Sequence, residues 1–496
     1  MNIEIFFHVT RQLVGRIMVG VSLLCIASIA RSEIKFTRDV APILVKRCIV
    51  CHGERTNLGG WRANTYQFLR KPGVSGLPAV TPGRPERSRI FQLITEKQLS
   101  NRMPKGDEPL SKSEISRIRS WIQAGAKFDG SDFNASLKSL LGPRSHPRPP
   151  AGYSSPAPVL ALALSPTGRE VASGGYNELL LWDAATGALK RRISGLPQQL
   201  HSIVFVGNGS KVLCGGGVPG EYGELAIIDL ATGVRKVIDT FPDMVSCAAV
   251  SRDGRRLAAG CVDCSVRCYS ASDFGALWVS RVHSDCITSV DFSADGRFVA
   301  SGSKDFTVKV NDAATGALFT TYNGHNKQFG KYKGQFPLYV LRFDPVLPVA
   351  YSAGGGPTVQ IWDPVKAAEE TGTAADMEER FAKESHAKHI EHGFRNEVYS
   401  LAIRKGSLFA ASGDGSVRQF DLASRALVRT YSGHTDWVFA LDVEASGAHL
   451  ATGSYDGEIR IWDVNTGALV TRLRNQPAGH MAIATAAARD APRTSR

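Results

Sequence analysis

The spacing of apolar residues changes along the chain from a helical pattern to a strand-like one near residue 159. Before that point, Val40, Ile43 and Leu44 fall on one face of an expected helix, with Thr37 as its N-cap and Cys48 at its end. The chain therefore begins with a helical part and continues with a part rich in strands.

A second helix is expected from Ser111, where Glu114 completes a capping box and apolar residues follow at helical spacing until Gly125. Between the two helices, residues 53–109 are rich in Gly, Pro and Arg and lack strong periodicity. Irregular stretches of this length are unusual in a small domain, so we expect a large ligand to replace part of the core.

From Val159 onward the sequence repeats, with an apolar strand, a turn, a strand rich in Ala, Ser and Gly, and two further strands in each unit. The third strands end at Trp182-Asp183, Ile228-Asp229, Cys268-Tyr269, Asn311-Asp312, Trp362-Asp363, Phe420-Asp421 and Trp462-Asp463. Seven units at this spacing indicate stacked repeats, because one such sheet cannot bury both of its faces alone.

This part of the chain, from about 159 to 475, resembles the WD40 family. The best single match is the unit 450–463, and Gly324-His325 and Gly433-His434 match the Gly-His element of the family. The resemblance implies an all-β, seven-bladed propeller, and the register allows each blade to form from contiguous sequence.

The resemblance also implies that His434, Asp456 and Trp462 belong to a structural hydrogen-bonded set within a blade and not to a catalytic triad. Two repeats depart from the pattern. The third lacks the Trp-Asp pair, and the fifth has Pro357 where the turn aspartate is expected. These departures affect local geometry and not the number of repeats.

The motif that carries chemistry is Cys48-Ile49-Val50-Cys51-His52. Two cysteines at this spacing form thioethers with haem vinyl groups, and the adjacent histidine ligates the iron. A redox dithiol would need a preceding strand, and a zinc site would need further ligands, whereas residues 33–150 contain no other cysteine and only His146 as a further histidine. The motif therefore predicts one covalently attached haem c.

Met103 is the only methionine between residue 32 and the repeats, and Pro104 stiffens its approach. We expect Met103 to be the second axial ligand of the haem iron, where a thioether opposite an imidazole raises the reduction potential. If it is only a loop residue, the iron is five-coordinate or open to a small ligand.

Residues from about 37 to 127 resemble the small c-type cytochrome domain found widely in planctomycete bacteria. The matching pieces, in addition to the cysteine motif, are Val40-Ala41-Pro42-Ile43-Leu44, Gly83-Arg84-Pro85-Glu86-Arg87-Ser88, Arg102-Met103-Pro104, Leu110-Ser111 and Trp121-Ile122-Gln123-Ala124-Gly125-Ala126. The resemblance implies a small all-α haem domain that carries electrons.

Residues 1–32 have the pattern of a secretory signal peptide, with an apolar run over 17–30 and small residues before a cleavage site after Ala30. An uncleaved anchor is the alternative and the only route to membrane association. We expect an exported protein of the periplasm or cell envelope. The expected parts are a signal peptide (1–32), a cytochrome c-like domain (33–130), a Pro-rich linker (131–158), the propeller (159–478) and a tail (479–496).

Most of the formal net charge of +13 lies in residues 33–150, where Lys and Arg outnumber Asp and Glu by about two to one. An exported protein rarely meets nucleic acid, so we expect no nucleic-acid partner. An acidic redox partner protein fits the basic charge better, with an acidic polysaccharide or a membrane surface as alternatives. A generally basic, solvated surface is the plain alternative.

Two other clusters have ordinary interpretations. Cys261, Cys264 and Cys268 are expected to be small buried thiols, with a disulfide or a metal site as alternatives. The insertion over 364–396 is expected to be a solvated helix, on which His386, His389 and His392 would drift around one face and could meet a metal.

Together these patterns predict an exported c-type cytochrome that transfers electrons through one haem, with the propeller as a platform for a protein partner. Two alternatives stay open. One is a surface scaffold whose haem is mainly structural, and the other is an enzyme whose propeller holds a substrate and passes electrons to the haem. An electron carrier is favoured over a self-contained enzyme because the repeats show only structural residues.

Overall fold

The computed structural model describes residues 33–49, 51–53, 58–105, 108–140, 145–326, 334–372 and 386–477. It divides into two compact units, residues 1–142 and 143–496. The expected signal peptide and C-terminal tail lie outside the described residues. Within the described ranges, no helix has the length and apolar character that crossing a membrane requires.

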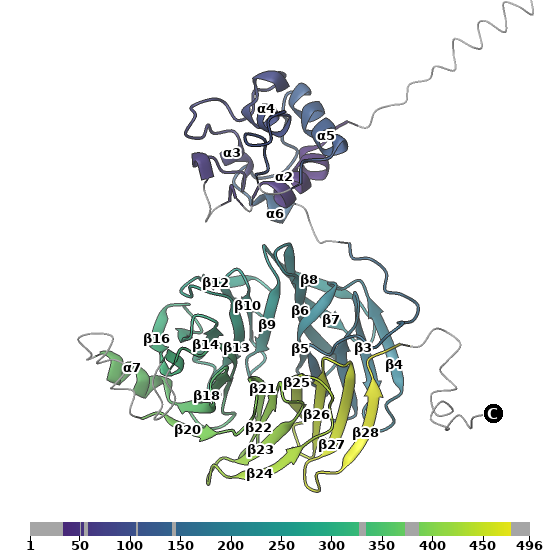
Figure 1. Cartoon of the computed structure of the whole chain (residues 1–496), viewed down its shortest axis with the longest axis vertical. Helices are drawn as coiled ribbons and strands as arrows, with labels where there is room; N and C mark the ends of the chain where they lie inside the picture. The colour runs from purple at the N-terminus through teal and green to yellow at the C-terminus, as the bar shows by residue number, and fades with distance from the viewer. Residues whose placement is uncertain are drawn as a thin grey trace, which may run out of the picture. The chain divides into compact units, whose positions relative to one another are not determined.

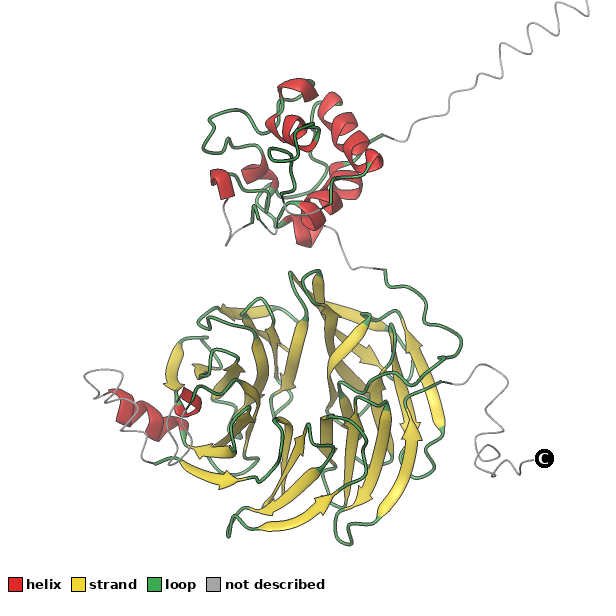
Figure 2. Ribbon diagram, in the orientation of Figure 1, coloured by secondary structure: helices red, strands yellow, loops and turns green. Residues whose placement is uncertain are grey.

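The first unit consists of short helices joined by irregular segments (Figures 1 and 2). The helical elements are η1 (Phe36–Val40), α2 (Ala41–Arg47), η2 (Leu58–Gly60), α3 (Tyr66–Leu69), η3 (Pro85–Arg87), α4 (Arg89–Ile94), α5 (Lys112–Gln123) and α6 (Leu137–Leu140). The expectation of a small helical part is confirmed.

The first expected helix is present, but Thr37 is not its N-cap. The π-helical turn η1 starts at Phe36, and the amide of Thr37 and its hydroxyl donate to the carboxylate of Asp129 at 2.8 and 2.9 Å. The Asp39 carboxylate instead accepts the backbone amide of Lys35 at the start of the element. A partner 92 residues away in sequence thus replaces the local cap that the sequence pattern indicated.

The second expected helix is α5, and its capping box is formed as predicted. The Ser111 hydroxyl accepts the amide of Glu114 at 3.2 Å, and the Glu114 carboxylate accepts the amide of Ser111 at 2.7 Å. The helix ends before Gly125, whose φ of +93° suits glycine. Its apolar face buries Trp121 completely against Phe36, with ring centroids 5.1 Å apart. The core of the helical unit therefore lies between α5, η1 and α3.

The second unit is a ring of seven four-stranded antiparallel sheets, which confirms the predicted seven-bladed propeller (Figures 1 and 2). Blades 1 to 3 contain β1 (Leu162–Leu164), β2 (Glu170–Gly174), β3 (Glu178–Asp183), β4 (Leu189–Ser194), β5 (Gln199–Val206), β6 (Lys211–Val218), β7 (Tyr222–Asp229), β8 (Arg235–Phe241), β9 (Val245–Val250), β10 (Arg256–Cys261), β11 (Val266–Ser270) and β12 (Ala276–Ser280). Every sheet is built from four consecutive strands.

Blades 4 to 7 follow the same plan. They contain β13 (Ile287–Phe292), β14 (Phe298–Ser303), β15 (Val308–Asp312), β16 (Leu318–Tyr322), β17 (Leu338–Phe343), β18 (Ala350–Gly354), β19 (Thr358–Trp362), β20 (Lys388–Glu391), β21 (Val398–Arg404), β22 (Ser407–Ser412), β23 (Val417–Asp421), β24 (Leu427–Tyr431), β25 (Val438–Val443), β26 (His449–Ser454), β27 (Glu458–Asp463) and β28 (Leu469–Arg474). Two short helices, η4 (Gly324–Asn326) and α7 (Pro364–Gly372), lie in the connections of blades 4 and 5.

The ring closes without a swapped strand, as the register predicted. Ile461 of blade 7 and Leu180 of blade 1 belong to one apolar cluster, so the first and last blades share a core. Asn475, fully buried after β28, accepts the Ser173 hydroxyl at 2.8 Å and donates to the carbonyls of Ala157 and Gly174. A polar residue beyond the last strand thus fastens the two ends of the ring.

The stretch expected to be a linker, 131–158, is divided between the two units. Leu137 is completely buried in the helical unit, and Ser136 pairs with Thr65 across a β-bridge. The ring of Phe133 lies 5.4 Å from that of Tyr66. Because these apolar side chains complete the helical core, the helical unit extends beyond residue 130.

Residues 145–158 lie in the propeller unit. His146 contacts the buried carboxylate of Glu224 at 3.1 Å, and the Tyr153 hydroxyl donates to the buried carboxylate of Glu178. The carbonyls of Pro150 and Ala151 accept the guanidinium of Arg192. An extended Pro-rich segment leaves its carbonyls free for such bonds, so it packs on the blades instead of spanning a gap.

The expectation that the three histidines of the blade 5 insertion share a helix is wrong. His389 lies on β20, the fourth strand of blade 5, because its neighbours pair with β19 to complete the sheet. His386 bonds to Glu370 of α7 at 2.8 Å, and His392 bonds to the carbonyl of Gly356 at 2.9 Å. The sheet therefore gives these side chains different partners.

The cysteines of blade 3 follow their ordinary interpretation in part. Cys261 and Cys268 are buried free thiols, and burial raises the pKa of Cys268 to about 11. Cys264 is half-buried at a φ of +65° in the turn between β10 and β11.

Candidate functional site

The Cys48 to His52 motif continues one turn beyond helix α2. The amide of Cys48 donates to the carbonyl of Leu44, and the amide of His52 donates to the carbonyl of Cys48, both at 2.9 Å. Residues four apart in such a turn lie on one side of the chain. Cys48 and His52 are therefore presented together, while Val50 lies outside the described residues.

The imidazole of His52 has a polar atom with no partner. Its Nδ1 is buried and makes no hydrogen bond to the described residues. The ring lies 5.0 Å from that of Trp61, and the backbone carbonyl of His52 accepts the amide of Ala63 at 2.7 Å. Buried polar atoms are normally paired. The unpaired Nδ1 of His52 therefore indicates that this side chain takes part in binding a ligand.

A cavity of about 530 Å³ opens beside the motif. Its lining residues come from α2, the loop around residues 58–79, α4 and the segment before α5. They are Arg47, Cys48, Cys51, His52, Leu58, Gly59, Trp61, Gly73, Val74, Ser75, Leu77, Ala79, Arg89, Ile90, Leu93, Ile94, Met103, Pro104, Lys105 and Leu110. This volume lies in the range of cofactor pockets.

Met103 reaches this cavity from a different part of the chain. Its amide donates to the carbonyl of Leu93 at 3.0 Å, which returns the loop after α4 to that helix. The peptide bond between Met103 and Pro104 is cis. All four residues predicted as haem ligands, Cys48, Cys51, His52 and Met103, thus line one cavity, although 51 positions separate the histidine from the methionine.

The residues of the cavity fit a haem group. Leu58, Val74 and Leu77 line it yet remain 56%, 84% and 49% exposed, so a flat apolar ligand would cover them. Two free thiols can form the thioethers of covalent haem attachment, and the adjacent imidazole, whose Nδ1 has no partner among the described residues, can ligate iron.

The cavity walls also carry three cationic side chains, those of Arg47, Arg89 and Lys105. Because haem carries two carboxylates, cations at its pocket neutralise the charge that burial would otherwise make costly. The sequence patterns did not single out these three residues. The feature of the sequence that could have indicated them is the excess of basic residues in 33–150.

The alternatives of a redox dithiol and a zinc site find no support here. Burial raises the pKa of the Cys48 thiol to about 12, whereas a reactive dithiol needs a lowered pKa. Among the described residues, the only metal-ligand group of three is far along the sequence, at His434, Asp456 and Glu458.

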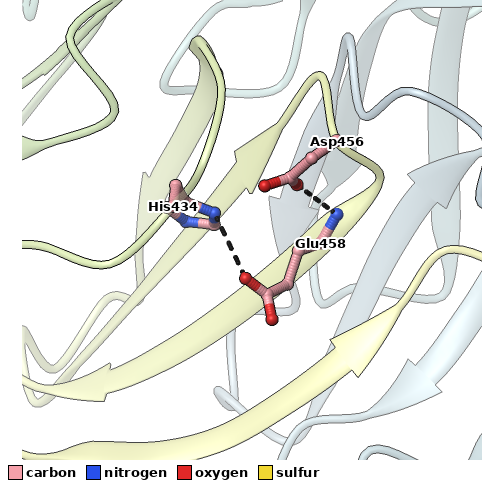
Figure 3. A group of neighbouring side chains, drawn as sticks. All are labelled: His434, Asp456 and Glu458. Atoms are coloured by element: carbon pink, nitrogen blue, oxygen red, sulfur yellow. Dashed lines mark hydrogen bonds and ion pairs between the residues drawn. The ribbon is translucent and has the colours of Figure 1, made fainter.

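That group in blade 7, drawn in Figure 3, is structural. The Glu458 carboxylate is already paired with the guanidinium groups of Arg460 and Arg472, which oppose a bound cation. Burial lowers the pKa of His434 to about 4, so its imidazole is neutral. The contact between His434 and Glu458 is 3.9 Å long.

His434 belongs to the hydrogen-bonded set that the repeat resemblance implied. Its Nε2 lies 2.8 Å from the Thr452 hydroxyl, which also accepts the indole N–H of Trp462 at 3.0 Å. The Asp456 carboxylate accepts the amide and hydroxyl of Thr435 instead of contacting the histidine.

Comparisons with known proteins agree with this two-part structure. Residues 48–107 match the family described as Planctomycete cytochrome C, and residues 235–270, 277–312 and 425–463 match the family described as WD domain, G-beta repeat.

The chain is also similar to several curated proteins. The U3 small nucleolar RNA-associated protein 15 homolog of Xenopus tropicalis is 26% identical over 46% of this chain and 39% of that protein. WD repeat-containing protein 1 of Xenopus tropicalis is 23% identical over 62% of this chain and 49% of that protein. The protein groucho of Drosophila melanogaster is 38% identical over 14% of this chain and 10% of that protein. The chain spans less than half of the length of each of these relatives.

The family matches, the sheet order and the cavity beside the cysteine motif lead to one assignment. This chain combines a planctomycete cytochrome c domain, matched at residues 48–107, with WD40 repeats that form a seven-bladed propeller.

Proposed function

We propose that this protein is an exported c-type cytochrome that transfers electrons through one covalent haem, while its propeller binds a protein partner. The observation that carries the proposal is the convergence of Cys48, Cys51, His52 and Met103 on one cavity of about 530 Å³. The cytochrome family match at residues 48–107 supports the same cofactor.

Each residue has a role in this proposal. Cys48 and Cys51 would tether the haem through thioethers, and His52 and Met103 would bind its iron. Bound haem supplies one-electron redox chemistry. The apolar walls around Leu58, Val74 and Leu77 exclude water, and Arg47, Arg89 and Lys105 hold the haem carboxylates.

Export follows from the pattern of residues 1–32, and it places the protein in the periplasm or cell envelope. The basic residues of the helical unit steer an acidic redox partner toward the haem. The propeller presents a large surface built from loops on a rigid ring, which suits it to hold a partner protein.

Spectroscopy and mass measurement test the haem. The protein should be produced with intact cytochrome maturation machinery. Mature protein is expected to carry the mass of one haem and to show a reduced c-type α-band that carbon monoxide does not shift. Two free thiols and no porphyrin adduct would overturn the proposal.

Methionine variants test the axial ligand. Met103→Ala is expected to open the iron to carbon monoxide and to lower the reduction potential, because the thioether favours ferrous iron. Met244→Ala is the matched control, since Met244 lies in the propeller between β8 and β9 and should change neither property. Equal spectra for Met103→Ala and the wild type would remove Met103 from the ligand set.

The same preparation separates electron transfer from the two alternatives. A structural haem predicts that an electron donor fails to reduce the iron, and that partner binding survives replacement of both cysteines. An enzyme predicts that a substrate alone reduces the haem. A carrier is expected to exchange electrons with small redox proteins and to remain oxidised when only a substrate is added.

A further inference from the structure

Five aromatic side chains form one connected cluster on three neighbouring blades. Tyr339, Tyr399 and Phe439 come from β17, β21 and β25, while Trp437 precedes β25 and Tyr455 lies in the turn between β26 and β27. The ring of Tyr399 lies 5.4 Å from Tyr339, 6.0 Å from Trp437 and 4.7 Å from Phe439. The ring of Phe439 lies 5.8 Å from Trp437 and 5.9 Å from Tyr455. We call these five residues the aromatic cluster.

The backbone directs three members of the cluster away from the sheets. In each of β17, β21 and β25 the pairing register shifts at one position, and the extra residues are Tyr339, Tyr399 and Phe439. A β-bulge of this kind releases a residue from the ladder and re-aims its side chain. These are the first strands of their blades, and strands such as β21 and β25 surround the middle of the ring (Figure 1).

The equivalent bulges of other blades carry different side chains. The extra residue is His201 in β5 and Thr288 in β13. The aromatic residues are therefore concentrated on blades 5 to 7. A structural need of the bulge itself would not select aromatic residues on only one side of the ring.

The outer members of the cluster are open to solvent. Trp437 is 45% exposed and Tyr455 is 49% exposed, whereas buried aromatic residues elsewhere in the propeller, such as Trp362, are about fully covered. Exposed aromatic residues that touch one another are typical of binding sites and not of scattered surface positions.

A carboxylate with no cationic partner among the described residues contacts the cluster. Glu397 accepts the hydroxyl of Tyr399 at 2.6 Å. Burial, and after it the negative charge of Glu397, raises the pKa of both Tyr399 and Tyr339. Asp436 accepts the amide of Trp437 at 2.8 Å. Among the described residues, neither Glu397 nor Asp436 forms an ion pair with Lys, Arg or His.

Three buried carboxylates of the propeller are paired with arginine. Glu178 is bound by Arg192, Glu224 by Arg235, and Glu458 by Arg460 and Arg472. Glu397 and Asp436 are only half-buried and accept hydrogen bonds from the neutral donors described above, so their charge is open to a cation from outside. Aromatic faces and a carboxylate together attract a cation, because each ring presents a negative face.

We propose that the aromatic cluster, together with Glu397 and Asp436, binds the ammonium or guanidinium group of a lysine or arginine side chain on a partner protein. This site rests on the proposed role of the propeller as a partner platform, and it specifies the chemistry of that partner. The stem of a lysine or arginine packs along the rings of Trp437 and Tyr455, while its charge meets the carboxylates.

Peptide binding to the full haem-loaded chain tests the site. The probe is the fluorescent peptide Ser-Gly-Arg-Lys-Arg-Gly-Ser, and the control peptide has glutamine at its three basic positions. Because the chain carries a net charge of +13, non-specific electrostatic attraction does not favour binding of the basic peptide. Anisotropy is expected to show about tenfold tighter binding of the basic peptide. Equal affinity for both peptides, or binding of neither, would overturn the proposal.

Variants locate the binding. Glu397→Gln and Trp437→Ala are each expected to weaken the basic peptide about tenfold, while Trp437→Phe keeps most of the affinity. Glu221→Gln is the control, because Glu221 is an exposed carboxylate in the turn between β6 and β7 of blade 2 and should leave the affinity unchanged. An equal loss in Glu221→Gln would show that general charge, and not this site, binds the peptide.

One further comparison separates this site from the partner platform. If a partner protein from envelope extracts binds Glu397→Gln as tightly as it binds the wild type, the propeller binds a partner but the proposed cation site is wrong. If the basic peptide binds but no envelope protein does, the cation site stands and the platform fails.

Discussion

The helical unit leaves apolar side chains such as Leu58 and Val74 exposed around a cavity, whereas the propeller fills the space between neighbouring blades with side chains from both. The reason is geometric. A blade always has another blade to cover it, but the short helices of the first unit cannot cover the face that the cysteine motif occupies. If the helical unit holds the proposed haem, that group completes its core, whereas the propeller completes its core with its own side chains.

The largest effect is expected when the haem cannot be attached. Replacing both Cys48 and Cys51 by alanine should destabilise the helical unit by about 4 kcal/mol or more, as expected when a tightly held ligand is removed from the folded state. Calorimetry should show a lowered or missing transition for this unit and an unchanged transition for the propeller. An unchanged transition for both units would contradict the comparison.

Asn475→Ala should act on the propeller alone. The change removes the acceptor of the buried Ser173 hydroxyl and the donor to the carbonyls of Ala157 and Gly174, at a cost of about 3 kcal/mol. Urea unfolding of the propeller measures this loss. Asn465→Ala, at an exposed turn position between β27 and β28, is the matched control and should change the free energy of unfolding by less than about 0.5 kcal/mol.

Mild acid should lower the stability of the propeller. Burial lowers the pKa of His201, His325 and His434 to about 4, below the value near 6.5 of an unfolded histidine. The unfolded propeller therefore binds more protons as pH falls below about 6.5, and the folded state loses stability until pH reaches about 4.

At pH 5.5 this loss is roughly 1 kcal/mol for each of these histidines. The melting temperature of the propeller should fall between pH 7.5 and 5.5, and the fall should be smaller in His325→Gln. A propeller transition that is independent of pH in this window would show that these imidazoles are not neutral and buried.

The smallest effect is expected at the capping box of α5. Ser111→Ala removes the acceptor for the amide of Glu114 and should cost about 1 kcal/mol in the helical unit. Ser116→Ala, at an exposed position inside the same helix, is the control and should be neutral or slightly stabilising. Equal effects of the two variants would mean that the cap contributes nothing to the stability of this unit.

Local patterns predicted much of this structure. The capping box of Ser111 and Glu114 formed because its two bonds join residues three apart. The seven blades could be counted because each repeat carries its own turns and strand pattern. The prediction that Thr37 is an N-cap was wrong because its hydroxyl binds Asp129. The prediction that His389 lies on a helix was wrong because its segment pairs with β19 as a strand.

The sequence by itself determined the chemistry of the cysteine motif, the repeat number and the identity of Met103 as a ligand candidate, since these depend on residue type and local spacing. Only the tertiary structure decided that Met103 meets His52 at one cavity, that residues 131–140 complete the helical core, and that Glu397 bonds to Tyr399 of the aromatic cluster. Such contacts join residues far apart in sequence. Their formation depends on how whole elements pack, which no local pattern contains.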